Sequence, residues 1–462
     1  MRYISTRGQA PDLSFEEAML TGLARDGGLY VPAEVPVMSK ADIAALAGLP
    51  YEEIAYRVMR PFVEGSFGDS EFSDIISRAY AGFDHDARAP LVQLGPNHFL
   101  LELFHGPTLA FKDFAMQLIG QMFQTALAKR GERVTIVGAT SGDTGSAAIE
   151  AFAGLEAVDV FIMYPDGRVS DVQRRQMTTP ADSNIHALAV AGDFDDCQAR
   201  LKDMFTDFTF RDEVRLAGVN SINWGRVLAQ VVYYFSSATA LGAPHRSVSF
   251  TVPTGNFGDI FAGYIARKMG LPIDKLVIAT NQNDILHRTL QTGAYSTKGV
   301  IPSISPSMDI QVSSNFERVL FDAYGRDGNA VAQVMDELKN SGAFKVSQGA
   351  IDSLRETFVS GRASEAETTA TIKDMRARTG EVLCPHSAVA VKVAEQHLGT
   401  EPMITLATAH PAKFPAAVEA ACGIHPSLPA RMSDLFDKPE RFTKVGNDLG
   451  ELTGLIRERL AS

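Results

Sequence analysis

Residues 133–152 read RVTIVGATSGDTGSAAIEAF, and this stretch decides the fold. A run of β-branched and small apolar residues, 133–139, leads into a turn rich in glycine and hydroxyl side chains, and an alanine-rich segment follows from Ser146. This order is typical of a buried strand, a tight loop and a helix that returns along the sheet. The stretch therefore predicts one strand–loop–helix unit of a parallel sheet covered by helices.

The same order recurs along most of the chain. Apolar runs that precede polar or glycine-containing turns and then helical patterns lie at 98–104, 133–139, 158–164, 184–190, 247–253, 275–280 and 403–408. So many units indicate an α/β protein, which we expect to form two doubly wound parallel-sheet domains. Ligands of such sheets bind at the carboxyl ends of the strands, so we expect the chemistry in the loops that follow these runs.

The remaining segments are mostly helical in pattern. Residues 1–88 predict a helical N-terminal region, in which Ser14 is placed to cap the first helix. We expect one α/β domain over residues 89–243 and a second over residues 244–462. The second carries a more polar stretch, about 297–380, which we expect to be a helical insertion.

Composition excludes several classes of function. The 462 residues carry 43 basic and 55 acidic side chains, a formal net charge of −12, so no overall attraction to nucleic acid or anionic lipid is expected. The three cysteines lie far apart and show no metal-ligand spacing, which predicts no metal site and a reducing, cytoplasmic location. The N-terminus lacks the apolar core of a signal peptide, and the uncharged stretch 227–244 predicts a buried helix rather than a membrane span. The sequence leaves the oligomeric state open between monomer and dimer.

Two loops combine glycines with the start of a helix. They read TSGDTGS at 140–146 and PTGNFGD at 253–259. Free backbone N–H groups and the helix dipole at such a point favour an anion. The first loop is not a Walker loop, because no lysine follows its last glycine, and its spacing GxxxGxxG is not the dinucleotide fingerprint. On the residues alone, each loop is equally compatible with a tight turn that carries a capping side chain.

A lysine and an arginine complete the candidates. Lys112 borders an apolar helical stripe, which favours a surface lysine that lays its stem on apolar residues; the alternative is a desolvated amine with a lowered pKa, suited to an imine. Asp113 is then a solvated charge or a local partner. The segment NSINWGR at 220–226 offers amide, hydroxyl and guanidinium groups that suit a second oxyanion, although an asparagine cap beside an exposed Arg226 is the alternative.

These loops together describe two phosphate-sized anion sites, one loop suited to a carboxylate, and a lysine. A phosphorylated cofactor held partly as an imine fits that set better than a nucleotide. His105, His410 and Lys413 also follow predicted strands, but no triad of nucleophile, base and acid can be assembled from their spacing.

Four segments, in the same order along the chain, resemble the signatures of threonine synthases, and the first is similar to that family's pyridoxal-phosphate lysine motif. They are HGPTLAFKDF at 105–114, ATSGDTG at 139–145, VPTGNFGD at 252–259 and TAHPAKF at 408–414. The opening MRYISTRG and the run DGGLY at 26–30 resemble the branch with a long N-terminal region. The resemblance spans nearly the whole chain and implies pyridoxal-phosphate fold type II, the fold of tryptophan synthase β.

The resemblance also implies a role for each matching residue. Lys112 would form the imine with pyridoxal phosphate and later serve as acid and base, and Thr408 would hydrogen-bond the pyridine nitrogen. Some relatives have asparagine at the position of Asp259, so only a backbone contact is expected there. The residues implied for the cofactor phosphate are Gly255, Asn256, Phe257, Gly258 and Asp259; those for the substrate carboxylate are Ser141, Gly142, Asp143, Thr144 and Gly145; and those for the substrate phosphate are Asn220, Ser221, Asn223 and Arg226.

The implied reaction converts O-phospho-L-homoserine and water to L-threonine and phosphate, the last step of threonine biosynthesis. It proceeds by γ-elimination and then by addition of water at the β-carbon. Two alternatives stay open: another type II enzyme such as a serine/threonine dehydratase, and a non-catalytic threonine synthase-like binding protein. A dehydratase needs no second phosphate site, and a binding protein is expected to lack Lys112 or the phosphate loop, both of which are present here.

Overall fold

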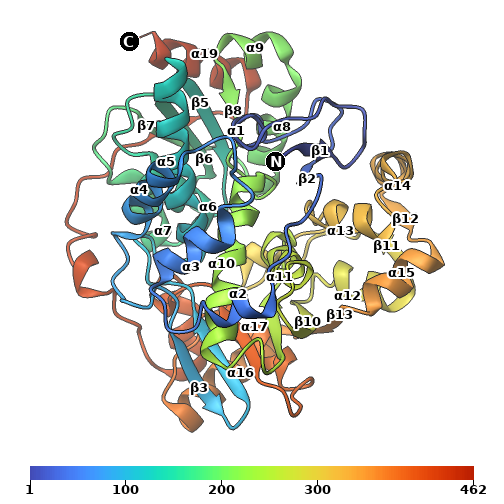
Figure 1. The fold of residues 1–462 in the computed structure, drawn as a ribbon. Helices are drawn as coiled ribbons and strands as arrows, with labels where there is room; N and C mark the ends of the chain where they lie inside the picture. Colours follow the sequence, from blue (N-terminus) through green and yellow to red (C-terminus); the bar gives the residue numbers. More distant parts are fainter. Residues whose placement is uncertain (462) are drawn as a thin grey trace.

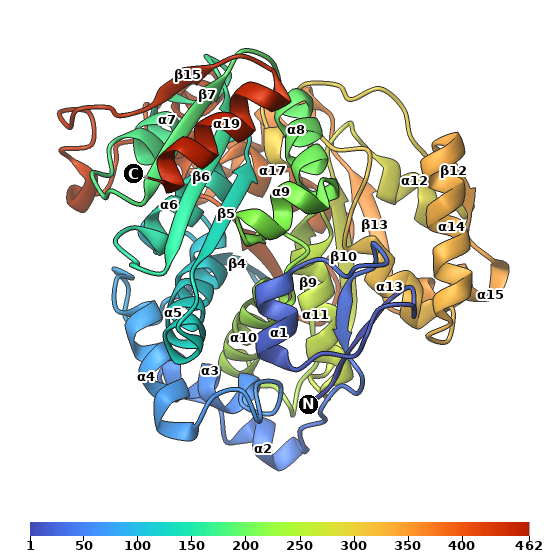
Figure 2. The ribbon, with the colours of Figure 1, turned by 90° about the horizontal axis from the view of Figure 1, so that it is seen from above.

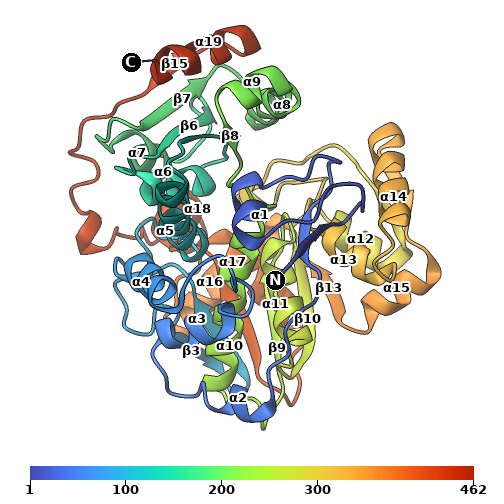
Figure 3. The same ribbon diagram turned by 45° about the horizontal axis from the view of Figure 1, so that its top comes forward.

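The computed structural model describes residues 1–461, and it contains two central sheets. The six-stranded sheet has the order β13-β10-β9-β14-β4-β3, with β3 (Leu91–Gly95), β4 (His98–Glu102), β9 (Val248–Pro253), β10 (Ile273–Thr280), β13 (Phe358–Arg362) and β14 (Met403–Ala407). The five-stranded sheet has the order β15-β7-β6-β5-β8, with β5 (Val134–Ala139), β6 (Val158–Pro165), β7 (Ile185–Val190), β8 (Leu216–Ala217) and β15 (Thr443–Val445). The two sheets occupy separate parts of the molecule (Figure 3).

The predicted α/β class is confirmed. Every neighbouring pair in the two sheets is parallel except β3 with β4. Each of the seven apolar runs singled out in the sequence contains a strand. A helix follows each of these strands because the polar turn ends the strand and the next segment has an apolar face that packs against the sheet.

The sheets do not divide along the predicted ranges. Strands β3 and β4, from the range 89–243, pair into the sheet that β9, β10 and β14 build. Strand β15, from the range 244–462, adds in parallel to β7 of the other sheet. Each sheet therefore takes strands from both ranges, and the chain passes between the sheets more than once.

Helices cover both sheets. The helices between β4 and β9 are α5 (Lys112–Arg130), α6 (Asp143–Phe152), α7 (Asp171–Thr178), α8 (Phe194–Thr206), α9 (Phe208–Glu213) and α10 (Trp224–Ala240). Those that follow are α11 (Gly258–Lys268), α12 (Ile285–Thr292), α13 (Phe316–Ala323), α14 (Gly328–Ser341), α15 (Gln348–Arg355), α16 (Glu365–Thr379), α17 (Pro385–Ala394), α18 (Pro415–Cys422) and α19 (Leu449–Leu460). Helix α10 is buried along nearly its whole length and packs against α11 and α5, which confirms the buried helix predicted within 227–244. No helix in residues 1–461 has both the length and the apolar run needed to cross a membrane.

The N-terminal region is mainly helical, as predicted, with α1 (Phe15–Thr21), α2 (Lys40–Ala44), α3 (Tyr51–Met59) and α4 (Asp69–Tyr80). Ser14 caps α1 in a capping box with Glu17. A short antiparallel pair, β1 (Tyr3–Ser5) and β2 (Tyr30–Pro32), was not predicted. This region lies against α10 (Figure 2), where Trp224 donates a hydrogen bond to the Tyr3 hydroxyl at 3.2 Å.

The stretch 297–380 is mostly helical, as expected, but it is not a separate insertion, because it supplies one strand of the six-stranded sheet. It contains helices α13 to α16. Helices α13, α14 and α15 lie with α12 and the antiparallel pair β11 (Ala294–Ser296) and β12 (Ala343–Lys345) on one side of the molecule (Figure 1), whereas α16 packs against α17 and α18. The stretch also contains β13, which pairs in parallel with β10 as the edge of the six-stranded sheet. The segment FVSGR is short and includes a glycine and an arginine, as an edge strand tolerates, and its apolar pattern is correspondingly weak.

Candidate active site

A cavity of about 210 Å³ lies where loops from both sheets meet. It is lined by the carboxyl-end loops of β5, β9 and β14, by the starts of α5, α10 and α17, and by a segment around η1 (Pro306–Met308). This is the position at which open α/β sheets bind ligands. Of the residues selected from the sequence, those that line the cavity are Lys112, Ser141, Thr144, Asn220, Ser221, Arg226, Gly255, Asn256, Phe257, Gly258, Asp259 and Thr408.

Lys112 is buried, so the prediction of a surface lysine is wrong. It is the first residue of α5, only 8% of its surface is exposed, and its amine lies 4.9 Å from the centre of the Phe111 ring. Burial lowers the pKa of Lys112, and the nearby charges of Arg226 and Lys413 act in the same direction, against the attraction of Asp143. A neutral, nucleophilic amine is therefore more accessible here than on a surface lysine.

Asp143 joins two buried lysines. Its carboxylate lies 3.4 Å from the amine of Lys112 and 3.1 Å from that of Lys413, and it accepts a 2.9 Å hydrogen bond from Gln173. Burial opposes its charge, but Lys413 and Lys112 hold the pKa of Asp143 well below its ordinary value. The side chain is thus an ionised partner of cations. The side chain is therefore committed to the two lysines, and a contact of Asp143 with the substrate carboxylate, which the resemblance implies through the loop amides and hydroxyls, is left to its backbone N–H.

The other residues of that loop divide into two kinds. Ser141 and Thr144 line the cavity. The amides of Gly142 and Gly145 instead donate to the Thr140 hydroxyl, each at 2.9 Å. Both interpretations of this loop therefore hold: Thr140 caps the turn through Gly142 and Gly145, while Ser141 and Thr144 face the cavity.

Asp113 is a local partner rather than a solvated charge. It is fully buried, and its carboxyl accepts hydrogen bonds from the backbone N–H of Thr108 at 2.8 Å and from the Thr108 hydroxyl. Burial raises the pKa of Asp113 to about 6. These contacts fix the turn that leads into α5 and so set the position of Lys112.

The loop after β9 forms a cradle at the start of α11. An added Cβ on Gly255 would lie 2.6 Å from the Ser307 carbonyl oxygen, so only glycine fits. Phe257 precedes the helix with φ of 63°, a left-handed conformation that is rare for an aromatic residue. Ser313 donates to the carbonyl of Gly255 at 2.7 Å, which ties down that side of the loop. The first amides of α11 have no acceptors within the helix and are suited to an anion.

Asp259 is a buried carboxyl within this cradle. The hydroxyls of Tyr233 and Tyr234 donate to its Oδ1 at 2.6 and 2.9 Å, while its Oδ2 is buried and has no partner. Burial raises the pKa of Asp259 to about 6, against the effect of the tyrosine hydrogen bonds and of Lys112. Tyr233 and Tyr234 thus occupy one carboxyl oxygen and hold the side chain against α10, which leaves the backbone of Asp259 as the part suited to a ligand contact.

Arg226 is a buried cation whose guanidinium meets no carboxylate within residues 1–461. Only 3% of the residue is exposed, one guanidinium nitrogen donates to the Val219 carbonyl at 3.3 Å, and Nε has no partner. Burial lowers the pKa of Arg226 to about 10. A buried guanidinium of this kind is the usual signature of an anion site. The alternative of an exposed Arg226 is therefore wrong.

Asn223 differs from its neighbours Asn220 and Ser221, which line the cavity. It caps α10: its side chain accepts from the Gly225 amide at 2.9 Å and donates to the carbonyls of Met19 and Gly218. Every polar atom of the side chain is used in this way. The structure therefore places Asn223 behind the site as a support.

Three further candidates lie outside the cavity lining. His105 is held between Asp84 and Glu102, and His410 accepts from the Ala412 amide. Lys413, in η2 (Pro411–Lys413), is completely buried and donates to the Thr108 carbonyl at 2.7 Å in addition to its pair with Asp143.

Sequence reasoning missed His386, the second residue of α17. It lines the cavity, is only 4% exposed, and its Nδ1 is buried without a partner. Its segment PHSAVAVKVA has the appearance of an apolar core helix, and the one polar residue beside the histidine, Ser387, pairs with Cys384 at the helix start.

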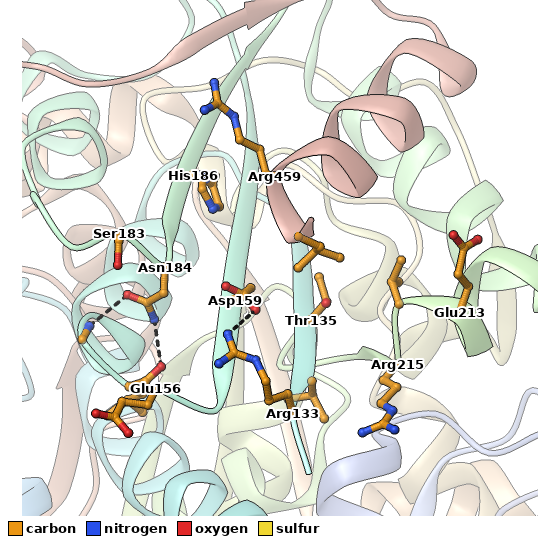
Figure 4. A pocket seen from close by; sticks show the side chains of 15 residues that line it. Arg133, Thr135, Glu156, Asp159, Ser183, Asn184, His186, Glu213, Arg215 and Arg459 are labelled. Atoms are coloured by element: carbon orange, nitrogen blue, oxygen red, sulfur yellow. Dashed lines mark hydrogen bonds and ion pairs between the residues drawn. The ribbon is translucent and has the colours of Figure 1, made fainter. Parts of the chain in front are cut away.

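A larger hollow, of about 930 Å³, lies at the opposite ends of the strands. Figure 4 shows it between β5, β6 and β7, with Arg133 directed at Asp159 and with His186 and Arg459 above them. It contains none of the residues selected from the sequence. Since parallel sheets place reactive loops at the carboxyl ends of their strands, we identify the smaller cavity as the candidate active site.

Three segments of the chain match known protein families. Residues 2–80 match the family described as "Threonine synthase N terminus", residues 84–344 match "Pyridoxal-phosphate dependent enzyme", and residues 387–456 match "Threonine synthase, C-terminal". A threonine synthase of Pseudomonas aeruginosa is 55% identical over 461 residues, which cover 99% of this chain and 98% of that protein.

Two solved structures are similar over the full length. The crystal structure of threonine synthase from Brucella melitensis with bound pyridoxal phosphate has a TM-score of 0.97 and 56% identity, and the match covers 100% of both chains. Threonine synthase from yeast has a TM-score of 0.93 and 40% identity, with 100% of this chain and 99% of that chain covered.

Proposed function

This chain belongs to the threonine synthase family, and on that premise we propose which of its residues carry the reaction. It is a lyase that depends on pyridoxal phosphate and converts O-phospho-L-homoserine and water to L-threonine and phosphate. The observation that carries the assignment of residues is the meeting of a buried amine, a helix N-terminus and a buried guanidinium in one cavity.

The groups around the cavity fit pyridoxal phosphate by their chemistry. The Lys112 amine suits an aldehyde, the start of α11 suits a phosphate, and the Thr408 hydroxyl at the end of β14 suits a ring nitrogen. The lack of a Cβ on Gly255 lets the Ser307 carbonyl pack against this loop, which fixes the loop at the cavity wall. We therefore assign the cofactor to Lys112, Thr408 and the loop of Gly255, Asn256, Phe257, Gly258 and Asp259.

When bound, pyridoxal phosphate joins the substrate amine covalently and draws electrons from its α-carbon, which makes protons on the substrate chain removable. Lys112 then accepts and returns these protons at Nζ. Its lowered pKa makes the neutral form available as a base, and Asp143, 3.4 Å away, stabilises the charged form after proton uptake. Asp143 and Lys413 act here as positioning residues.

Arg226, Asn220 and Ser221 bind the phosphate group of the substrate in this proposal, and Ser141 and Thr144 bind its carboxylate. Arg226 holds the phosphate while the bond between the γ-carbon and oxygen breaks, and its charge stabilises the departing group. A dehydratase that acts on serine has no use for this buried cation. The absence of a carboxylate beside Arg226 among the described residues therefore favours a phosphorylated substrate.

The test compares wild type with Lys112→Ala, each assayed with O-phospho-L-homoserine and with serine. We expect purified wild type to show a near-visible absorbance band that borohydride abolishes, and to form L-threonine and phosphate from O-phospho-L-homoserine but little product from serine. Lys112→Ala should lose the band and nearly all turnover. Turnover near that of wild type in Lys112→Ala would overturn the assignment, and preferential use of serine would favour a dehydratase.

We also propose a cytoplasmic location. The three cysteines are free thiols, and Cys197 and Cys384 are buried, which fits a reducing compartment.

A further inference from the structure

His386 has a defined protonation state in the structure. Its Nε2 accepts a hydrogen bond from the backbone N–H of Ser307 at 3.2 Å. A backbone amide can only donate, so Nε2 carries no proton, and the neutral ring must carry its single proton on Nδ1.

The proton on Nδ1 has no acceptor within residues 1–461. This nitrogen is buried and has no hydrogen-bond partner. The residue as a whole is only 4% exposed, and it lines the cavity. The ring is held from another side by Phe414, whose centroid lies 4.8 Å away. A buried donor without an acceptor is costly in free energy unless a ligand supplies one.

The ring stays neutral at physiological pH. Burial lowers the pKa of His386 to about 4, and the charges of Lys112 and Lys413 act in the same direction against Asp143. The donor is therefore present throughout the range in which the protein works, without the cost of another buried cation.

The position of His386 indicates which part of a ligand it meets. Its ring lies 4.8 Å from that of Phe414, the residue that follows Lys413. The amine of Lys413 in turn pairs with Asp143, in the loop that also holds Ser141 and Thr144. His386 thus lies beside the loop to which the substrate carboxylate is assigned.

We propose that His386 is a catalytic residue in its neutral form, whose Nδ1–H donates a hydrogen bond to the carboxylate of the bound amino-acid substrate. This inference rests on the proposed function of the cavity and adds a residue to it.

Two substitutions separate this role from a structural one. In His386→Gln the side-chain amide reaches the position of Nε2 and can still accept from Ser307, but the donor at Nδ1 is gone. In His386→Asn the amide nitrogen takes the position of Nδ1, and the contact with Ser307 is lost. We expect kcat/KM to fall about 10- to 100-fold in His386→Gln, the range for a lost hydrogen bond to a charged group, and clearly less in His386→Asn. A larger fall in kcat/KM for His386→Asn than for His386→Gln would overturn the proposal, because it would show that the hydrogen bond from Ser307 matters and the donor at Nδ1 does not.

His98 provides the matched control. It too is a buried histidine with a pKa lowered to about 4, and its Nε2 is bonded to Thr405 at 2.8 Å, but it lies at the amino end of its strand and does not line the cavity. His98→Gln should leave kcat/KM within twofold of wild type. A loss as large as that of His386→Gln would assign both effects to general destabilisation and overturn the proposal.

Binding measurements distinguish the carboxylate from the other anions of the site. With histidine labelled by ¹⁵N, L-threonine should shift the Nδ1–H resonance that His386→Gln removes, and inorganic phosphate should not. The affinity of the apoprotein for pyridoxal phosphate should be the same in His386→Gln and wild type. A response to phosphate alone, or weaker cofactor binding alone, would overturn the contact with the carboxylate. Failure of the proposed function itself would appear separately, as wild type that forms no threonine.

Discussion

Replacement of Asp143 by asparagine is expected to destabilise the protein strongly. Asp143 is 3% exposed, and its carboxylate faces the amines of Lys413 and Lys112 at 3.1 and 3.4 Å. At an effective dielectric constant of about 20, each pair is worth roughly 5 kcal/mol of Coulomb energy before desolvation is subtracted. Asp143→Asn leaves two buried ammonium groups without a counter-charge, and breaking such a buried pair costs about 3–5 kcal/mol.

Urea-induced unfolding of the apoprotein measures this loss. The pKa of Asp143 in the folded state is well below its ordinary value of 3.8, so its contribution is fully present above about pH 4 and is lost only as the pH falls through the folded pKa. The difference between wild type and Asp143→Asn should therefore be constant between pH 5 and 8. Asp374→Asn, which removes an exposed partner of Arg378, is the control and should cost less than 1 kcal/mol.

A double variant tests the reasoning more sharply. Adding Lys413→Met to Asp143→Asn removes one of the two unpaired cations, so about 1–3 kcal/mol of the lost stability should return. Additive losses would refute the idea that the unpaired charge causes the destabilisation. Equal stability of wild type and Asp143→Asn would refute the ion pairs themselves.

Three other substitutions probe the cavity. Gly255→Ala places a Cβ 2.6 Å from the Ser307 carbonyl oxygen and should weaken pyridoxal phosphate binding about 5- to 100-fold in a fluorescence titration, whereas Gly299→Ala, with nothing within 4 Å, should not. Asp259, with a pKa raised to about 6, keeps a proton in the folded protein that the unfolded chain releases near pH 4. The free energy of unfolding of wild type relative to Asp259→Asn should therefore fall by up to about 3 kcal/mol as the pH rises from 4 to 7. A difference that does not change with pH would contradict the raised pKa. Arg226→Met should raise KM for O-phospho-L-homoserine at least about 10-fold without lowering apoprotein stability, because it removes a buried cation that no carboxylate accompanies; an unchanged KM would exclude Arg226 from the phosphate site.

The regular elements of the fold were largely predictable because their signal is local. Each of the seven strand–loop–helix units carries its own apolar run and its own turn, and each forms a strand. The partition of strands between sheets was not predictable. The three residues of β15 carry almost no pattern, and they join β7, more than 250 positions earlier in the sequence, through tertiary packing alone. Edge strand β13 was not predicted for a similar reason, since an edge strand tolerates the glycine and arginine that weaken its apolar pattern.

The site could be located from sequence, but the state of its side chains could not. Whether Lys112 is solvated or desolvated depends on Phe111 beside it and on Asp143, 31 positions away, and the stripe around the lysine favours the wrong answer. Asn223 and Asn220 look alike in the sequence, yet one is consumed by capping α10 and the other faces the cavity. His386 has no sequence signal at all, because its significance comes from a bond to Ser307 in a segment far away along the chain.

The distribution of charge explains how a chain of net charge −12 accommodates phosphorylated molecules. Three cations are buried in and around the site, where solvent screens them little: Lys112 and Arg226 line the cavity, and Lys413 lies behind it, paired with Asp143. Of the two carboxyl groups beside them, Asp143 is committed to two lysines, and Asp259 has a pKa raised to about 6 and so resists ionisation. The interior of the site is therefore positive although the chain is acidic. Selectivity for small anions over polyanions follows, because an acidic chain repels an extended chain of phosphates and only a molecule that enters the cavity meets the cations.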